Sequence, residues 1–272
     1  MKEERDRLFR SALPEIPPFA FDTEVAEVFD DMANRSIPFY AEVQRLTAAL
    51  ASRYATEESA VYDLGCSTGA TLVALRDALR GRKVQLIGVD SSEAMCRRAR
   101  EKLGAGGGES TAPRHGDAES TAPRPRGGDG RRDEPTPPVE IRRDDITETP
   151  IRNASAVIMN YTLQFVPTLK RRPLLERIHS GLLPGGILLI SDKTLQGSSD
   201  VSRLFVDIYY ELKRSMGYSG LEIAQKREAL ENVLIPYRME EELELLRGSG
   251  FRSVDLYFTW CNFSSFICVK ES

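Results

Sequence analysis

A short apolar run that ends between two glycines constrains the fold of this chain more than any other feature. Residues 61–69 read Val-Tyr-Asp-Leu-Gly-Cys-Ser-Thr-Gly, and residues 86–90 read Leu-Ile-Gly-Val-Asp. The first run predicts a strand that turns sharply into a helix from Ala70, so that backbone N–H groups and the positive end of the helix face the turn. The second predicts a strand that ends on the carboxylate of Asp90. An acidic residue at that point of a βαβ unit accepts hydrogen bonds from ribose hydroxyls, so the two runs predict a nucleoside site.

The spacing within the turn separates two classes of nucleoside ligand. A dinucleotide site carries Gly-x-Gly-x-x-Gly, because its second glycine lets the backbone approach a pyrophosphate. Here Cys66 and Ser67 stand where that glycine would be, which disfavours a pyrophosphate. The pattern instead resembles the first motif of the class I S-adenosylmethionine-dependent fold, whose turn passes the methionine part of the ligand. A glycine turn without a ligand, in an ordinary α/β protein, is the alternative.

Residues 104–138 form a low-complexity insertion. This segment holds eight of the chain's 20 glycines and six of its 15 prolines, and Glu-Ser-Thr-Ala-Pro-Arg occurs in it twice, at 109–114 and 119–124. It has almost no large apolar side chains and cannot bury a core. We therefore expect a surface insertion within a single domain that spans residues 1–272.

Composition excludes several classes of protein. The formal net charge is −4, and the insertion carries five arginines against six acidic residues, so no basic arm for direct nucleic-acid binding is present. No apolar run reaches the length of a signal peptide or of a membrane span, so we expect no membrane association. The cysteines have no spacing typical of zinc ligands or of a disulfide framework, which predicts no metal and favours the cytoplasm. The four are Cys66, Cys96, Cys261 and Cys268.

Hydrophobic periodicity predicts an α/β domain with a mostly parallel seven-stranded sheet. A helical cap is expected in residues 1–55, and a long helical segment over 200–247. The expected strands are 60–64, 84–89, 139–141, 156–159 and 187–191, followed by an antiparallel hairpin of 253–260 and 263–269. The expected crossover helices are 70–80, 92–103 and 168–180, the second with Ser91 or Ser92 as its N-cap and the third ending in the turn 181–186.

Polar residues follow the predicted parallel strands. Gly65, Asp90, Asp145 and Asn160 each stand at or just beyond the carboxyl end of one strand. Ligands of open parallel sheets bind outside these ends, so the four residues are expected to converge on one crevice. Only two histidines are present, His115 in the insertion and His179 in a predicted helix, which disfavours a histidine general base.

Outside the insertion, the chain resembles the carboxy-S-adenosyl-L-methionine synthases. The last two motifs of the match are specific, because ordinary methyltransferases have no reason to carry them. The matching segments are residues 21–22, 34–38, 61–67, 160–165, 217–219, 225–227 and 230–233.

The resemblance implies an enzyme that converts S-adenosyl-L-methionine and prephenate into carboxy-S-adenosyl-L-methionine and phenylpyruvate. No methyl group is transferred. The family chemistry has prephenate lose a carboxyl group as carbon dioxide, which a sulfonium ylide captures after the methyl carbon of S-adenosyl-L-methionine has lost a proton. The product is the donor for 5-oxyacetyl uridine at the tRNA wobble position, which implies a functional link to a tRNA carboxymethyltransferase.

The resemblance assigns the new carboxylate of the product to Arg227, on a helix predicted over 221–234. A guanidinium binds a carboxylate through two parallel hydrogen bonds, so Arg227 is our candidate catalytic residue. In the family this arginine is thought to reach the site from a neighbouring subunit, which implies a homodimer. A solvated arginine on a helix surface is the alternative.

Further positions of the ligand site come from the same resemblance. Tyr40 and Asn160 are assigned to the polar groups of S-adenosyl-L-methionine and to the region of its sulfonium. Gly65, Cys66 and Ser67 are assigned backbone contacts to the methionine part. Asp90 and Ser91 are assigned to the ribose and adenine, and Asp145 and Ile146 to the adenine amino group and ring face. Ser91 departs from the family's asparagine and Phe39 from its glycine, which puts the details of these contacts in doubt.

Two other functions share part of this pattern. An ordinary class I methyltransferase acting on a small acceptor has the same nucleoside half, but no use for Arg227. A non-catalytic S-adenosyl-L-methionine-binding partner of a tRNA-modifying enzyme would bind the same ligand without turnover. Conversion of prephenate separates both from the main interpretation.

Overall fold

The computed structural model describes residues 5–104 and 134–271. Most of the insertion, both copies of its repeated hexapeptide and His115 lie outside the described residues. The helices are α1 (Thr23–Ser36), α2 (Tyr40–Tyr54), α3 (Ala70–Ala78), α4 (Glu93–Gly104), α5 (Thr168–Gly181), α6 (Ser199–Ser215), α7 (Gly220–Ala229) and α8 (Met239–Gly248), with a 3-10 turn, η2 (Leu163–Phe165). The strands are β1 (Ala60–Leu64), β2 (Gln85–Asp90), β3 (Val139–Arg143), β4 (Ala154–Asn160), β5 (Leu182–Leu195), β6 (Tyr237–Arg238), β7 (Ser253–Trp260) and β8 (Phe263–Val269).

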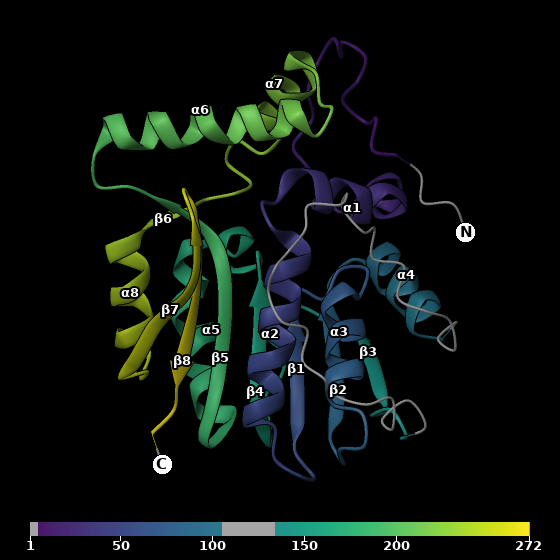
Figure 1. The fold of residues 1–272 in the computed structure, drawn as a ribbon, viewed down its shortest axis with the longest axis vertical. Coiled ribbons are helices and arrows are strands. Elements are labelled where there is room, and N and C mark those ends of the chain that lie inside the picture. The colour runs from purple at the N-terminus through teal and green to yellow at the C-terminus, as the bar shows by residue number, and fades with distance from the viewer. Residues whose placement is uncertain (1–4, 105–133, 272) are drawn as a thin grey trace, which may run out of the picture.

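The strands form one sheet in the order β3-β2-β1-β4-β5-β8-β7 (Figure 1). The first five are parallel, and β8 pairs with β5 in the antiparallel sense, as the predicted hairpin requires. The strand order reverses between β1 and β4, which defines the switch point at which ligands of such sheets bind. Within this register Leu64 pairs with Val89, so Gly65 and Asp90 emerge together at the carboxyl edge.

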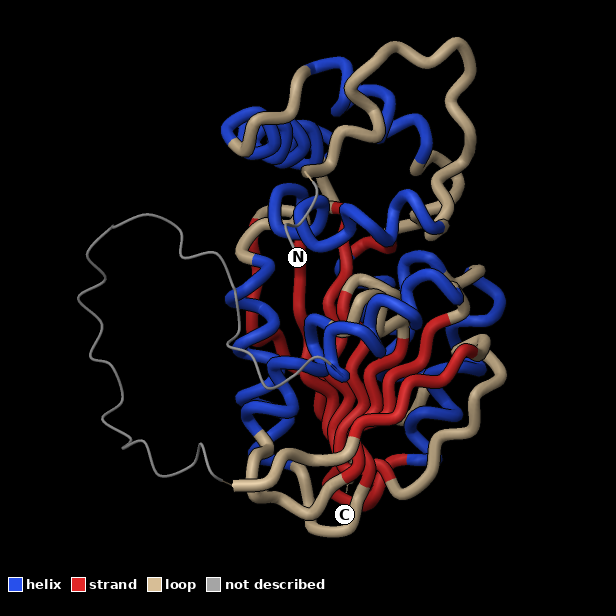
Figure 2. The backbone as a smooth tube through the Cα atoms, turned by 90° about the vertical axis from the view of Figure 1, so that its right-hand side faces the viewer, coloured by secondary structure: helices blue, strands red, loops and turns tan. Residues whose placement is uncertain are grey.

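Helices cover both faces of the sheet (Figure 2). On one face, side chains of α5 and α8 such as Leu175 and Leu246 are fully buried against alternate residues of β1, β4 and β5. On the other face, α2 and α3 bury Ala51 and Leu72 against the intervening residues of the same strands. Continuous apolar strands with both faces covered are typical of a parallel sheet, and their alternation divides the core into two layers.

A third group of helices lies across the carboxyl edge of the sheet. Figure 1 shows α1, α6 and α7 above the ends of the central strands, with the N-terminal segment beside α7. The segment is tied there by the side chain of Gln225, which donates to the carbonyl oxygens of Phe9 and Ser11 and accepts from the N–H of Leu13. Residues far apart in sequence therefore enclose the switch point from above.

Several predicted boundaries differ from the structure. The segment 181–186, expected to be a turn, belongs largely to β5, because Leu182 pairs with Ala154 before the register shifts. The helix expected over 221–234 ends at Ala229. The two-residue strand β6 pairs with β5 and makes the sheet eight-stranded rather than seven-stranded. A strand this short has no periodicity that could predict it.

The end of the insertion is also corrected. Residues 134–138, assigned to it on composition, are bonded to the body of the domain. Gly81 donates its N–H to the carbonyl oxygen of Pro135, and Leu86 at the start of β2 donates to that of Pro138. Among residues 5–104 and 134–271, no helix is long and apolar enough to cross a membrane.

Candidate active site

The turn after β1 has a backbone that demands glycine. Gly65 has a φ of 77°, and a Cβ there would collide with the side chain of Thr162, two residues beyond β4, so any larger residue is disfavoured. The N–H groups of Gly65 and Cys66 donate to the carbonyl oxygen of Val89. Because protein groups already use these donors, we expect the turn to contact a ligand through its carbonyl oxygens rather than through the N–H groups that the motif suggested.

Asp90 joins the two halves of the nucleoside motif. One carboxylate oxygen accepts the N–H of Ser67 at 2.9 Å, and the other accepts that of Ser92 at 2.9 Å. Burial raises the pKa of Asp90, while the two backbone hydrogen bonds act in the opposite direction. Each carboxylate oxygen retains a second lone pair, so Asp90 can hold the turn and still accept hydroxyl groups of a ribose.

Ser92, not Ser91, starts α4. Its hydroxyl accepts the N–H of Met95 at 3.3 Å and donates to the carbonyl oxygen of Phe21. The side chain of Ser91 is exposed next to Asp90. Ser91 is therefore accessible, and its contact with the ribose and adenine stays a prediction.

Asn160 belongs to a group of buried polar side chains behind the turn that follows β1. Its amide nitrogen lies 3.4 Å from the side-chain oxygens of Gln44 and of Thr71, and its amide oxygen is buried without a hydrogen-bond partner in the described part of the chain. Tyr40 is half-buried on the same helix as Gln44, and burial followed by the charge of Asp30 raises the pKa of its hydroxyl. A buried acceptor without a donor is typical of a position that a ligand completes.

Asp63 lies within the same polar group and was not among the predicted site residues. It is 1% exposed, and burial followed by the charge of Asp90 raises the pKa of its carboxyl group to about 8. Cys66, also buried, has its thiol pKa raised mainly by burial and then by Asp63 and Asp90. A protonated thiol is a poor nucleophile, so Cys66 contributes shape rather than covalent chemistry.

The third strand ends in a turn that presents Asp145 and Ile146. Asp145 is exposed, accepts the N–H of Thr147 at 2.8 Å and lies 3.9 Å from the ammonium of Lys170. The hydrogen bond from Thr147 lowers the pKa of Asp145, which keeps the carboxylate charged. Ile146 is half-buried against the core. An apolar side chain beside a charged acceptor suits an adenine ring and its amino group.

A cluster of aromatic side chains extends from Tyr40, beside the buried polar side chains, toward α6. The ring centroids of Tyr40 and Tyr161 are 6.4 Å apart, those of Tyr161 and Phe263 are 6.2 Å apart, and those of Phe263 and Tyr209 are 5.2 Å apart. Tyr209 belongs to α6 and donates its hydroxyl to the carbonyl oxygen of Ser36. The aromatic cluster thus connects the nucleoside half of the site with the helices above it.

Arg227 lies on α7 with its side chain exposed. In the described part of the chain it makes no hydrogen bond or ion pair, although its charge acts on the nearby Lys213. The helix is held in place by a capping box in which Ser219 and Glu222 bond each other's backbone, and by Lys226, which donates to the hydroxyl of Ser36 at 3.1 Å. Arg227 is therefore a free cation on a fixed helix.

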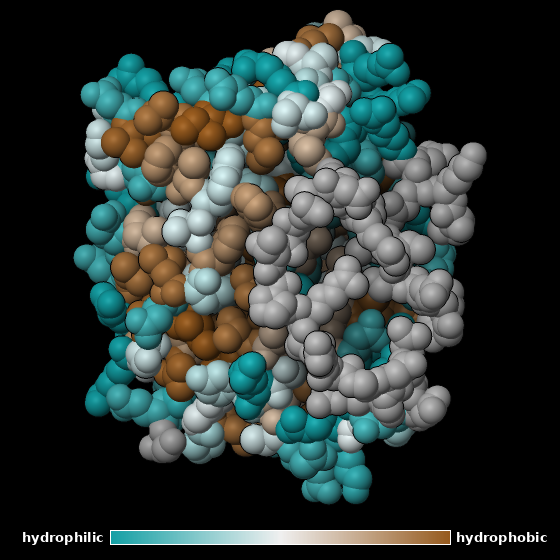
Figure 3. Space-filling model, in the orientation of Figure 1, coloured by the Kyte–Doolittle hydropathy of each residue, from teal (hydrophilic) through white to brown (hydrophobic). Residues whose placement is uncertain are grey.

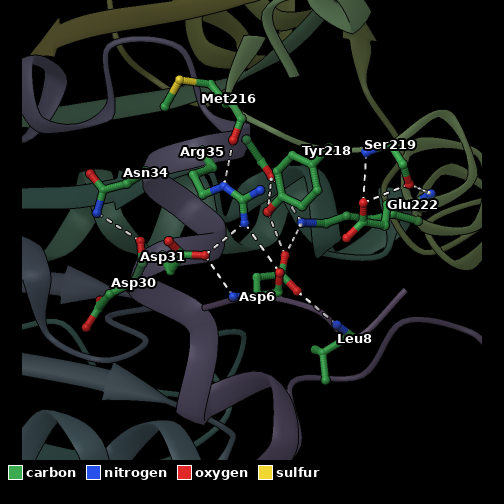
Figure 4. A network of polar contacts seen from close by, with 12 residues as sticks. Asp6, Leu8, Asp30, Asp31, Asn34, Arg35, Met216, Tyr218, Ser219 and Glu222 are labelled. Carbon is green, nitrogen blue, oxygen red and sulfur yellow. Dashed lines mark hydrogen bonds and ion pairs between the residues drawn. The ribbon is translucent and has the colours of Figure 1, made fainter. Parts of the chain in front are cut away.

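A charged network joins the N-terminal segment, α1 and the start of α7 (Figure 4). Arg35 donates to Asp31 at 3.0 Å and to the carbonyl oxygen of Met216 at 2.9 Å, and its guanidinium lies 4.0 Å from the ring centroid of Tyr218. Tyr218 donates to Asp6 at 2.6 Å, and Asp6 lies 3.9 Å from the ammonium of Lys226. The motif residues 217–219 thus hold α7 in position rather than contact the nucleoside.

The structure brings most predicted residues to the carboxyl edge of the sheet: Tyr40, Gly65, Cys66, Ser67, Asp90, Ser91, Asp145, Ile146 and Asn160. Gln44, Asp63 and Thr71 join them and were missed. The spacing of Gln44 from Tyr40, four residues on one helix, is a signal that could have found it. Within residues 5–104 and 134–271, no three His, Cys, Asp or Glu side chains are grouped to hold a metal ion.

Comparison with known structures defines the class of protein. Human N-acetylserotonin methyltransferase in complex with S-adenosylmethionine superimposes with a TM-score of 0.55 at 16% identity, over 92% of this chain and 56% of that one. An O-methyltransferase family 2 protein from Planctomyces limnophilus gives 0.57 at 18% identity, over 91% and 61%. A family model described as a methyltransferase domain matches residues 62–188. The fold is that of the class I S-adenosylmethionine-dependent proteins.

Sequence comparison identifies the family within this class. The carboxy-S-adenosyl-L-methionine synthase of Methylococcus capsulatus is 42% identical over 98% of this chain and 99% of its own length. That of Desulfotalea psychrophila is 40% identical over 99% of both. The chain belongs to the carboxy-S-adenosyl-L-methionine synthase family, which confirms the resemblance seen in the motifs.

Proposed function

We propose that the protein makes carboxy-S-adenosyl-L-methionine and phenylpyruvate from S-adenosyl-L-methionine and prephenate. The observation that carries this proposal is family membership over nearly the whole chain, including α7 with its free arginine. Prephenate loses its ring carboxyl group as carbon dioxide and its ring hydroxyl group as hydroxide when the ring becomes aromatic. The methyl carbon of S-adenosyl-L-methionine gives up a proton, which forms water with the hydroxide, and bonds to the carbon dioxide.

Two sets of residues bind S-adenosyl-L-methionine, one its nucleoside part and the other its methionine part. Asp90 and Ser91 hold the ribose, and Asp145 with Ile146 holds the adenine. The turn of Gly65, Cys66 and Ser67 contacts the methionine part of the substrate through its carbonyl oxygens. Tyr40 and the amide of Asn160 contact the polar groups next to the sulfonium.

Arg227 binds the carboxylate that is formed on the methyl carbon. A guanidinium carries a positive charge in a planar group, and two parallel hydrogen bonds fix the orientation of the carboxylate. In an ordinary methyltransferase the methyl carbon carries no carboxylate, so no cation is needed beside it. A non-catalytic binding protein would have no reason to hold an unpaired cation above the ligand.

Substitution of Arg227 tests this assignment. We expect Arg227→Ala to abolish most conversion of prephenate while the protein stays folded, and Arg227→Lys to restore only part of it, because lysine keeps the charge but loses the bidentate geometry. Affinity for carboxy-S-adenosyl-L-methionine should fall far more than affinity for S-adenosyl-L-methionine. Arg252→Ala, which removes an exposed arginine from the residue before β7, is the control. Equal losses for the two ligands, or full turnover by Arg227→Ala, would contradict the role.

The protein is also proposed to act as a cytoplasmic homodimer in which Arg227 serves its own site or the neighbouring one. Helix α6 supports this, because only Tyr209 and Lys213 of its 17 residues are buried, while Val201 and Leu204 are exposed. Figure 3 shows apolar surface gathered along this helix and over the strands beneath it. The product would pass to a tRNA carboxymethyltransferase that modifies the wobble uridine.

The cap of residues 1–55 and the segment 200–247 are proposed to be added walls of one S-adenosyl-L-methionine-binding domain. Helices α1, α6 and α7 come from these two segments and lie over the switch point (Figure 1). The network around Asp6, Arg35 and Tyr218 bonds the two segments to each other. This enclosure gives the second substrate a place above the nucleoside.

A further inference from the structure

Two lysines meet on one aromatic ring above the switch point. Lys193 lies near the end of β5, two residues after the partner of Asn160 in the sheet, and Lys213 lies on α6. The ammonium of Lys193 lies 4.5 Å from the ring centroid of Tyr209, and that of Lys213 lies 4.6 Å from the same centroid. The sheet and the helix above it thus each contribute one cation to the same place.

Within residues 5–104 and 134–271, neither ammonium has an anionic partner. In the described part of the chain, no carboxylate or carbonyl oxygen accepts a hydrogen bond from either one, although Lys213 is only 6% exposed. The charges that act on Lys213 are those of Lys193, Lys226 and Arg227, all positive. Lys226 differs from this pair, because it donates to Ser36 and lies beside Asp6.

Burial without a partner is costly for a charged group. Desolvation, followed by the neighbouring cations, lowers the pKa of Lys213 to about 7, and burial lowers that of Lys193 to about 8. A stable core would replace such residues with apolar ones or pair them with carboxylates. Both lysines contact aromatic rings but no carboxylate of the described residues, which indicates that an anion from outside the chain completes them.

We propose that Lys193 and Lys213 form the subsite for the carboxylate that the second substrate keeps through the reaction. This inference rests on the proposed function, under which that group is the pyruvyl carboxylate of prephenate. Prephenate carries two carboxylates, and the one on the ring leaves. The pyruvyl carboxylate stays on the molecule, and we place it at the lysine pair.

The surroundings of the pair fit the rest of such a substrate. Tyr209 is the member of the aromatic cluster that contacts the lysines. Its other members, Phe263, Tyr161 and Tyr40, extend from Tyr209 toward Asn160. Flat apolar side chains suit a six-membered ring. A molecule anchored by its side-chain carboxylate at the lysines would direct its ring toward the sulfonium region.

The test compares Lys193→Gln and Lys213→Gln with Lys83→Gln, which removes an exposed lysine far from the site. We expect each site variant to raise KM for prephenate at least about tenfold, because a charge-assisted hydrogen bond is lost. The Kd of S-adenosyl-L-methionine should stay within about twofold of wild type, and Lys213→Arg should recover part of the loss. Because an unpaired buried charge is removed, Tm should not fall in either glutamine variant. An unchanged KM, or equal losses for both substrates, would overturn the subsite.

A second measurement separates this inference from the proposed function. Phenylpyruvate, which keeps the same carboxylate and does not react, is titrated into the wild-type protein and the variants by calorimetry. Binding that weakens at least about tenfold in Lys193→Gln and Lys213→Gln supports the subsite, even if the wild-type protein forms no carboxylated product and the proposed function fails. Failure of phenylpyruvate to bind the wild-type protein, or equal binding by all variants, overturns the subsite while turnover of prephenate still decides the function.

Discussion

At the scale of single residues, Asp90 combines a structural and a ligand-binding task. Its carboxylate holds the N–H groups of Ser67 and Ser92 and faces the expected ribose. We predict that Asp90→Ala weakens binding of S-adenosyl-L-methionine at least about tenfold, since hydrogen bonds to a charged group contribute roughly 1.5–3 kcal/mol each. Calorimetry on the folded variant checks this. Affinity equal to wild type would remove Asp90 from the site.

If Lys213 binds the carboxylate of the second substrate, that binding should depend on pH. Its pKa in the free protein is lowered to about 7, and a bound carboxylate favours the charged form, so binding above pH about 7 must take up a proton. We predict that affinity for phenylpyruvate falls as pH rises from about 7 to about 9. Calorimetry in buffers of different ionisation enthalpy should show proton uptake in the wild-type protein. Uptake that persists unchanged in Lys213→Gln would contradict this assignment.

The spacing of the motif predicted correctly that Gly65 and Asp90 lie side by side at the carboxyl edge of the sheet. Their contacts with a nucleoside stay predictions, and the lysine pair proposed for the second substrate was not predicted at all. The pairing of Lys193 with Lys213 depends on α6 folding back over β5, which no local pattern specifies. Phe39 shows a further limit, because its φ of 53° fits the glycine that the resemblance led us to expect there, yet the chain places a phenylalanine, 58% exposed, in this conformation.

At the scale of elements, the insertion boundary gives a direct test. Residues 105–133 include no large apolar side chain, whereas the carbonyl oxygens of Pro135 and Pro138 accept hydrogen bonds from Gly81 and Leu86. We predict that replacing 105–133 by a short glycine–serine linker leaves Tm and turnover near wild type. Removing 104–138 instead should lower stability by about 1–3 kcal/mol, because the N–H of buried Leu86 loses its acceptor. Equal stability of the two deletions in chemical denaturation would contradict the corrected boundary.

The strands were easier to predict than the helices above them. The hairpin of β7 and β8 has the predicted limits, because alternation and a tight turn define it locally. By contrast, β5 begins five residues earlier than expected, since pairing with β4 overrides the preference of Pro184 and Gly185 for a turn. Helix α7 ends at Ala229, where the carbonyl oxygen accepts the N–H of Phe19 from the N-terminal segment. Such long-range contacts cannot be predicted from a single stretch of sequence.

At the scale of the whole molecule, the exposed apolar face of α6 predicts a dimer. Leu204 is 55% exposed in the middle of this helix. We expect light scattering to give a dimer for the wild-type protein and a shift toward monomer for Leu204→Glu, because a charge on an apolar interface must be desolvated. Leu169→Glu is the matched control, since Leu169 is 92% exposed on α5. A monomeric wild-type protein, or equal masses for both variants, would contradict an interface at α6.

The central claim is that the chain adds a carboxyl group to S-adenosyl-L-methionine. The most direct measurement is mass spectrometry of the nucleoside formed when the purified protein is incubated with S-adenosyl-L-methionine and prephenate. We expect an ion heavier than S-adenosyl-L-methionine by the mass of one carbon dioxide, together with an equal amount of phenylpyruvate. Formation of S-adenosylhomocysteine with a methylated acceptor, or recovery of both substrates unchanged, would contradict it.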